Sequence, residues 1–133
     1  MKGLVLLTAL AAAFSIASAV GAEEVGREEY AKACAGCHGS DAEGLGPIAR
    51  TLNIDAPDLR ELAMRNGGVF PFKKSLMTID GRQNVRLHGS TMPIWGERYS
   101  SSASLSESEV NPEIIARGRL LSLVYYLESI QKQ

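Results

Sequence analysis

The chain has 133 residues, with 14 lysine and arginine residues against 15 aspartate and glutamate residues. This length is typical of about one domain, and the hydrophobic fraction of 45% is ordinary for a globular protein. The near-neutral charge argues against nucleic acid as the main partner, because proteins that bind phosphate backbones usually carry a strong basic excess.

The first 22 residues are predicted to be a secretory signal peptide. Lys2 supplies a short positive start, an almost wholly apolar stretch follows, and small residues come next. Cleavage fits after Ala19 or Ala22, and we favour Ala22 because two glutamates then open the mature chain. The alternative is an uncleaved membrane anchor, since residues 3–22 carry no charge. Only in that case would a membrane be a partner.

The first half of the mature chain is predicted to contain two helices. Acidic residues favour a helix start before residue 25, and this helix would run over residues 25–35. Residues 39–53 are rich in glycine and are expected to form a loop. Pro57 suits the first turn of a second helix, which would end at Gly67.

The second half is predicted to alternate between helices and loops. A third helix is expected to begin at Pro71 and to end at Asp80, before a glycine. Residues 88–96 are predicted to form an extended loop. Residues 97–110 contain six serines and are predicted to be a mobile surface loop.

The last helix has the clearest pattern. Asn111, Pro112 and Glu113 provide a cap, a proline at the first position and an acidic first turn. The helix is expected to reach Ile130. Apolar residues recur along it at intervals of three or four: Ala116, Leu120, Leu123, Leu127 and Ile130. No convincing strand or hairpin pattern is found, so the predicted fold class is all-α.

Residues 34–38 read Cys-Ala-Gly-Cys-His, a C-x-x-C-H motif that contains the only two cysteines of the chain. This spacing is the pattern of covalent haem c attachment. The two thiols add to the two vinyl groups of a haem, and the following histidine ligates the iron. The motif therefore predicts one haem c, attached through Cys34 and Cys37, with His38 as an iron ligand.

Two other uses of these cysteines fit the sequence less well. A thioredoxin-like dithiol would need a βαβ context, and no strand pattern is present. A zinc site formally needs four ligands such as two cysteines and two histidines, but His38 directly follows Cys37, which strains ligation of one ion by both. Haem c is attached outside the bacterial inner membrane, so the motif and the signal peptide together predict a periplasmic location, with a membrane-anchored form facing the periplasm as the alternative.

A second axial ligand is expected from Met92. It precedes Pro93, which favours the extended backbone of a ligand-bearing loop, and a His/Met pair raises the potential and suits electron transfer. His88 is the competing ligand, and an open sixth site is a further alternative. Met64 and Met77 lie in predicted helices, where packing is the expected role.

With these residues the chain resembles the monohaem class I c-type cytochromes across residues 23–133. Gly26-x-x-x-Tyr30 and Leu123-x-x-Tyr126-Leu127 are similar to the family's first and last helices. The resemblance implies a cytochrome c fold, in which those helices cross around the haem and the glycine permits their close approach.

Two further segments carry the resemblance. Gly46-Pro47 is similar to the family segment whose proline carbonyl accepts the proton of the proximal imidazole, a contact that orients the ligand and raises its basicity. Met92-Pro93-x-Trp95-Gly96 resembles the distal-ligand loop, so Met92 is implied as iron ligand and Trp95 as a residue that packs near the haem.

The expected function is single-electron transfer in a periplasmic chain, by a carrier that is not itself an enzyme. Its expected partners are an electron donor and an electron acceptor, both redox proteins. A basic stretch between Arg60 and Arg98 is either ordinary solvated charge or a docking face for an acidic partner. The alternatives are a haem c subunit of a dehydrogenase or oxidase complex, and a haem sensor or peroxidase-like protein with an open distal site.

Overall fold

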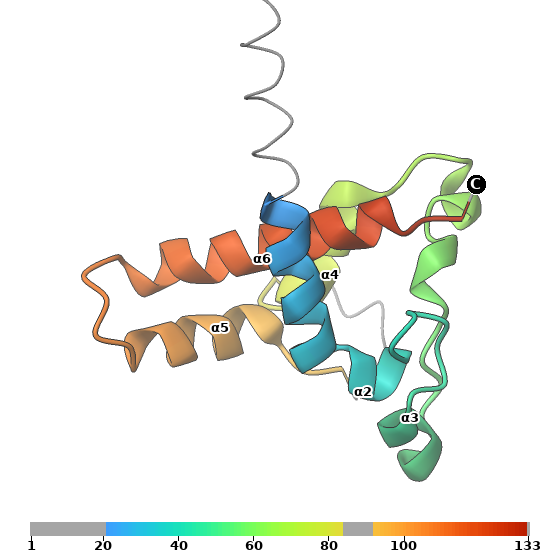
Figure 1. Cartoon of the computed structure of the whole chain (residues 1–133), viewed down its shortest axis with the longest axis horizontal. Helices are drawn as coiled ribbons and strands as arrows, with labels where there is room; N and C mark the ends of the chain where they lie inside the picture. The colour runs from blue at the N-terminus through green and yellow to red at the C-terminus, as the bar shows by residue number, and fades with distance from the viewer. Residues whose placement is uncertain (1–20, 84–91, 133) are drawn as a thin grey trace, which may run out of the picture.

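The computed structural model describes residues 21–83 and 92–132 (Figure 1). These residues form helices and no strand, which confirms the predicted all-α class. An N-terminal helix occupies residues 21–33. It is followed by α2 (Ala35–His38), α3 (Pro47–Leu52), two short 3-10 helices η1 (Leu59–Glu61) and η2 (Met64–Asn66), α4 (Phe72–Asp80), α5 (Trp95–Ser104) and α6 (Pro112–Ser129).

The N-terminal helix crosses α6 at a point where the two backbones touch (Figure 1). A Cβ atom on Gly26 would lie 1.9 Å from the carbonyl oxygen of Ser122, so only glycine permits this approach. One turn further along, the rings of Tyr30 and Tyr126 lie 5.4 Å apart between centroids. The sequence features that implied contact between the first and last helices therefore do meet in the structure.

The predicted start and apolar face of α6 are confirmed. The Asn111 side chain accepts a hydrogen bond from the backbone N–H of Glu113 at 2.8 Å, and Pro112 is the first helical residue. Four of the five residues of the predicted apolar stripe are buried, and Ile130 is partly buried. Burial of this stripe is what holds α6 at the centre of the fold.

The serine-rich segment is the main correction to the predicted elements. Residues 97–104 belong to α5, which lies alongside α6 (Figure 1). Trp95, Tyr99 and Ala103 are spaced by four residues and face the core, and the latter two are buried. Serine hydroxyls on this helix bond to carbonyls of the same helix, as Ser104 does to Ser100. The many serines of this segment predicted a loop, although its few apolar residues have the spacing of one face of a helix.

The predicted loop over residues 39–53 and the predicted second helix are also corrected. Residues 47–52 form α3, which begins at Pro47. The second helix is replaced by a stretch without regular secondary structure over residues 54–58 and by η1 and η2. Asp58 has an extended backbone and caps η1 by accepting from the N–H of Arg60. This irregular segment, and not a helix, brings the Pro57 carbonyl to His38.

The remaining predictions have mixed outcomes. α4 follows Pro71 and ends at Asp80 as expected, with Gly81 in the left-handed conformation. Of the predicted extended loop over residues 88–96, positions 88–91 lie outside the described residues, whereas Trp95 and Gly96 begin α5. Positions 1–20 of the predicted signal peptide also lie outside them. No helix in the described part of the chain is long and apolar enough to cross a membrane.

Candidate haem-attachment site

The C-x-x-C-H motif forms a single helical turn directly after the N-terminal helix. The carbonyl of Cys34 accepts hydrogen bonds from the backbone N–H groups of Cys37 and His38, at 3.1 and 2.9 Å. Cys34 is buried, Cys37 is half-buried, and the two cysteines are not joined by a disulfide. The turn therefore presents two free thiols and one imidazole from five consecutive residues.

The following loop folds back beneath this turn. Gly44 donates its N–H to the carbonyl of His38 at 2.7 Å, and Gly46 donates to the carbonyl of Cys37 at 2.8 Å. A Cβ atom on Gly46 would lie 2.5 Å from the carbonyl oxygen of Gly36 and 2.7 Å from that of Ala35. Glycine at position 46 is thus required for the loop to satisfy the carbonyls at the end of α2.

The His38 imidazole is oriented by a backbone carbonyl. The residue is 7% exposed, and its Nδ1 lies 3.1 Å from the carbonyl oxygen of Pro57. Because a carbonyl can only accept, Nδ1 is the nitrogen that carries the proton, and the lone pair of the neutral ring is then on Nε2. This is the tautomer of a histidine that ligates a metal through Nε2.

The acceptor of this contact differs from the sequence expectation, which named Pro47. The structure places Pro57 there instead. Pro47 is the first residue of α3, and its carbonyl accepts from the Thr51 hydroxyl at 2.9 Å, within its own helix. Sequence reasoning missed Pro57 because that residue was assigned to the start of a helix.

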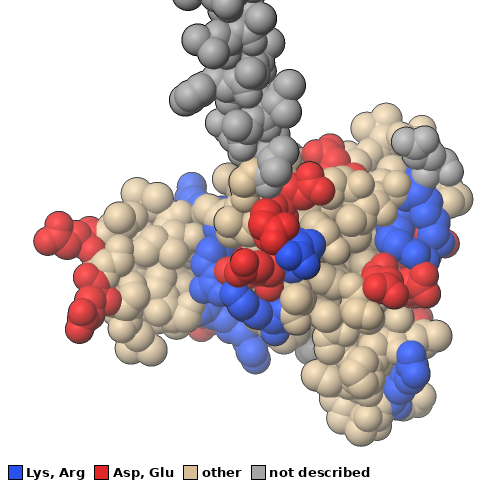
Figure 2. Space-filling model, in the orientation of Figure 1, with Lys and Arg blue, Asp and Glu red and all other residues tan. Residues whose placement is uncertain are grey.

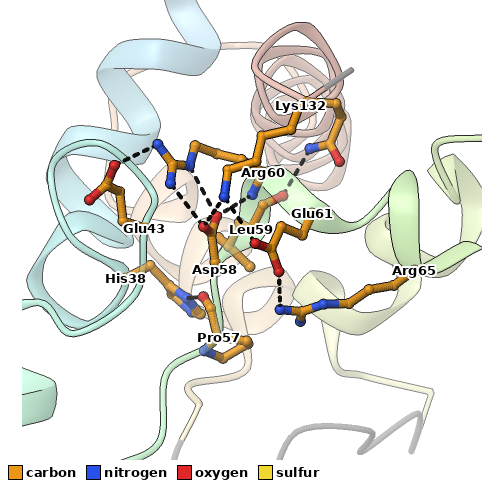
Figure 3. A network of polar contacts seen from close by, with 10 residues as sticks. His38, Glu43, Pro57, Asp58, Leu59, Arg60, Glu61, Arg65 and Lys132 are labelled. Atoms are coloured by element: carbon orange, nitrogen blue, oxygen red, sulfur yellow. Dashed lines mark hydrogen bonds and ion pairs between the residues drawn. The ribbon is translucent and has the colours of Figure 1, made fainter. Parts of the chain in front are cut away.

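The segment that carries Pro57 is surrounded by charged groups (Figure 3). The Asp58 carboxylate accepts from the guanidinium of Arg60 and from the ammonium of Lys132, each at a shortest distance of 2.9 Å. The hydrogen bonds from Arg60, and then those from Lys132, hold the pKa of the Asp58 carboxyl well below its usual range. Asp58 therefore remains a carboxylate over the whole neutral range.

The Cys34 thiol is not poised for thiol–disulfide chemistry. Burial raises its pKa to about 12, and the nearby carboxylate of Glu29 and the Cys37 thiol act in the same direction. A redox-active dithiol needs a lowered thiol pKa, because the thiolate is the attacking species. The environment of Cys34 therefore argues against the dithiol alternative.

Met92 and Trp95 pack against the same core as Cys34. Both are half-buried, and the core cluster that they contact includes Cys34, Leu59 and Leu123. Met64, by contrast, is 57% exposed and does not have the packing role expected for it. Met77 is half-buried. The competing ligand, His88, lies outside the described residues.

These residues fit a covalently attached haem by their chemistry. Two unbridged thiols lie one turn apart, the imidazole is held in the ligating tautomer, and a thioether side chain contacts the same core. Within residues 21–83 and 92–132, no three side chains of histidine, cysteine, aspartate or glutamate come together as a metal-binding group.

The predicted basic stretch is neutralised only in part by local ion pairs. Arg60, Arg65 and Arg82 each pair with a carboxylate, whereas Lys73 and Lys74 are exposed. Figure 2 shows positive and negative side chains interspersed on the face that it presents. Arg98 lies over the Trp95 ring, 5.5 Å from its centroid.

Comparison with protein-family models, with curated proteins and with solved structures finds no match for this chain. The chemistry of the site therefore has to be inferred from its own residues.

Proposed function

We propose that this chain is a haem c protein of the c-type cytochrome class. One haem would be attached through Cys34 and Cys37, with His38 as an axial ligand of the iron. The observation that carries the proposal is the contact between His38 Nδ1 and the Pro57 carbonyl, within one helical turn of two free cysteines. That contact leaves Nε2 as the ring nitrogen through which His38 would ligate the iron.

Within this class, we infer that the chain is an exported single-electron carrier. When bound, the haem supplies a one-electron Fe(III)/Fe(II) couple. Met92 would occupy the second axial position, which closes the site to external ligands in both oxidation states. Its half-buried position against the core is consistent with this role, as is the packing of Trp95 three residues later.

The chain contributes attachment, orientation and exclusion of water. Cys34 and Cys37 fix the position of the group, and the Pro57 carbonyl fixes the plane and tautomer of His38. The low exposure of Cys34 and His38 would keep solvent from the histidine ligand and from one of the two attachment points. The substrates are then electrons alone, supplied and removed by a donor and an acceptor that are themselves redox proteins.

Binding of carbon monoxide tests the closed distal site. The reduced, haem-loaded protein is expected not to bind carbon monoxide rapidly at neutral pH, whereas Met92→Ala is expected to bind it readily. Met64→Ala is the matched control, because that side chain is 57% exposed and should leave the spectrum unchanged. Rapid binding by the unmodified protein would contradict the carrier function and favour a sensor or peroxidase-like role. If Met92→Ala binds carbon monoxide no faster than the unmodified protein, Met92 is not the iron ligand.

A further inference from the structure

Gln131, at the end of the described chain, joins α6 to the segment after Pro57. Its side-chain oxygen accepts from the backbone N–H of Ala63 at 2.8 Å. Its side-chain nitrogen donates to the carbonyl of Leu59 at 2.8 Å and to the carbonyl of Leu127 at 2.6 Å. One amide thus satisfies three backbone groups, two of them on the segment that follows Pro57.

Lys132 ties the same segment by its backbone and by its side chain (Figure 3). Its N–H donates to the carbonyl of Arg60 at 2.8 Å. Its ammonium group donates to Asp58 and to Glu61, at 2.9 Å each. Arg60 in turn extends to Glu43 at 2.6 Å, so the ion pairs reach the loop that lies beneath the C-x-x-C-H turn.

These ties bear directly on the Pro57 carbonyl. The peptide between Pro57 and Asp58 is planar, so the Pro57 carbonyl and the Asp58 backbone N–H can only turn together. Holding the segment from Asp58 onward therefore limits how far that carbonyl can turn. The backbone N–H of Leu59 also donates to the carbonyl of Ala42 at 2.9 Å. The segment is therefore fixed from the loop on one side and from the C-terminal residues on the other, with the His38 contact between them.

We propose that Gln131 and Lys132 are positioning residues for His38. They hold the Pro57 carbonyl at Nδ1 and thereby set how strongly the imidazole donates electrons to the iron. This inference rests on the proposed function, because it takes His38 to be an iron ligand. We call the contacts of Gln131 and Lys132 with residues 58–63 the C-terminal clamp. A stronger hydrogen bond at Nδ1 raises the basicity of a ligating histidine and favours the ferric state of the iron. Loosening the C-terminal clamp should therefore favour the ferrous state.

The test compares Gln131→Ala with Asn111→Ala in the full, haem-loaded protein. Asn111 caps the N-terminal end of α6, whereas Gln131 follows its C-terminal end. Loss of the Asn111 side chain should therefore destabilise α6 and leave the contacts of Gln131 and Lys132 in place. Two properties are measured: the rate of hydrogen–deuterium exchange at His38 Nδ1 by NMR of the reduced protein, and the reduction potential. Lys132→Met provides a milder variant, because it removes two side-chain ion pairs and keeps the backbone bond of Lys132 to Arg60, whereas Gln131→Ala removes all three bonds of the Gln131 side chain.

Gln131→Ala is expected to speed the Nδ1 exchange about tenfold and to shift the ferric–ferrous equilibrium toward ferrous by up to about tenfold, or about 59 mV for one electron. Lys132→Met should move both values less, in the same direction, and Asn111→Ala should move neither. Unchanged exchange and potential in Gln131→Ala, with haem attached, would overturn the proposal. An unmodified protein that carries no haem would overturn the proposed function itself, and this is seen before any variant is compared.

Discussion

Gly26 is the residue at which the N-terminal helix and α6 come closest. A Cβ atom there would meet the backbone of Ser122, which cannot move without displacing α6. Gly118 offers a direct comparison, because it lies in α6 with no atom within 4 Å of the position that its Cβ would take. The two glycines therefore differ in what an added methyl group would meet.

Gly26→Ala is expected to lower the free energy of unfolding by about 1–3 kcal/mol, the range for overpacked contacts. Gly118→Ala is expected to leave the free energy of unfolding unchanged or to raise it by up to about 1 kcal/mol, because alanine has a higher helix propensity than glycine at an exposed position inside a helix. Denaturant unfolding of both variants checks this. Similar effects of the two substitutions would mean that the helices do not touch at Gly26.

Single residues also show what the sequence can and cannot predict about the site. Cys34, Cys37 and His38 are adjacent in the chain, so their spacing alone predicts their chemistry. The Pro57 contact depends on the path of a distant loop, and Pro47 was a plausible acceptor from sequence. The Gln131 contact with Leu59 joins residues 72 positions apart, and no local pattern predicts it.

Among the elements, α4 and α6 were predicted well because their ends carry explicit capping residues. α5 was not, because its serines suggested a loop while its buried face consists of only a few residues at intervals of four. The expected second helix does not form. Residues 54–58 have no regular secondary structure, and their path places the Pro57 carbonyl at His38, a contact with a distant segment that no local pattern predicts.

Proline substitution distinguishes a helix from a loop in the serine-rich segment. Ser101→Pro falls within α5 and is expected to lower the free energy of unfolding by about 3 kcal/mol, through a lost hydrogen bond and a steric clash. Ser108→Pro, in the connection after α5, should cost much less, since its backbone is not helical. Circular dichroism and denaturant unfolding measure both. Equal, small effects would restore the loop interpretation.

For the molecule as a whole, ion pairs join segments that are far apart in the chain. Arg82, just after α4, pairs with Glu113 in the first turn of α6, and Arg119 of α6 pairs with Glu29 of the N-terminal helix. Hydrogen bonds from Arg82, and then from Arg117, lower the pKa of the Glu113 carboxyl from 4.5 to about 2. The lowered pKa of Glu113 links the stability of the fold to pH.

The sign of this linkage follows from the lowered pKa. Unfolding restores the ordinary pKa, so the unfolded state binds more protons in this range. The contribution of Glu113 is therefore fully present above about pH 4.5 and is lost as the pH falls toward about 2. Glu113→Gln is expected to flatten the fall in unfolding free energy between pH 5 and pH 2, as followed by thermal or denaturant unfolding. An unchanged slope would show that the pair does not persist in solution.

The central claim is that one haem is covalently attached through Cys34 and Cys37. Its most direct test is the intact mass of the purified protein under denaturing conditions, read together with its pyridine haemochrome spectrum. We expect the mass of the chain plus one haem, with the spectral signature of two thioether bonds, and loss of that signature when both cysteines are replaced by serine. A chain mass without haem, or a haem released by denaturation, would contradict it.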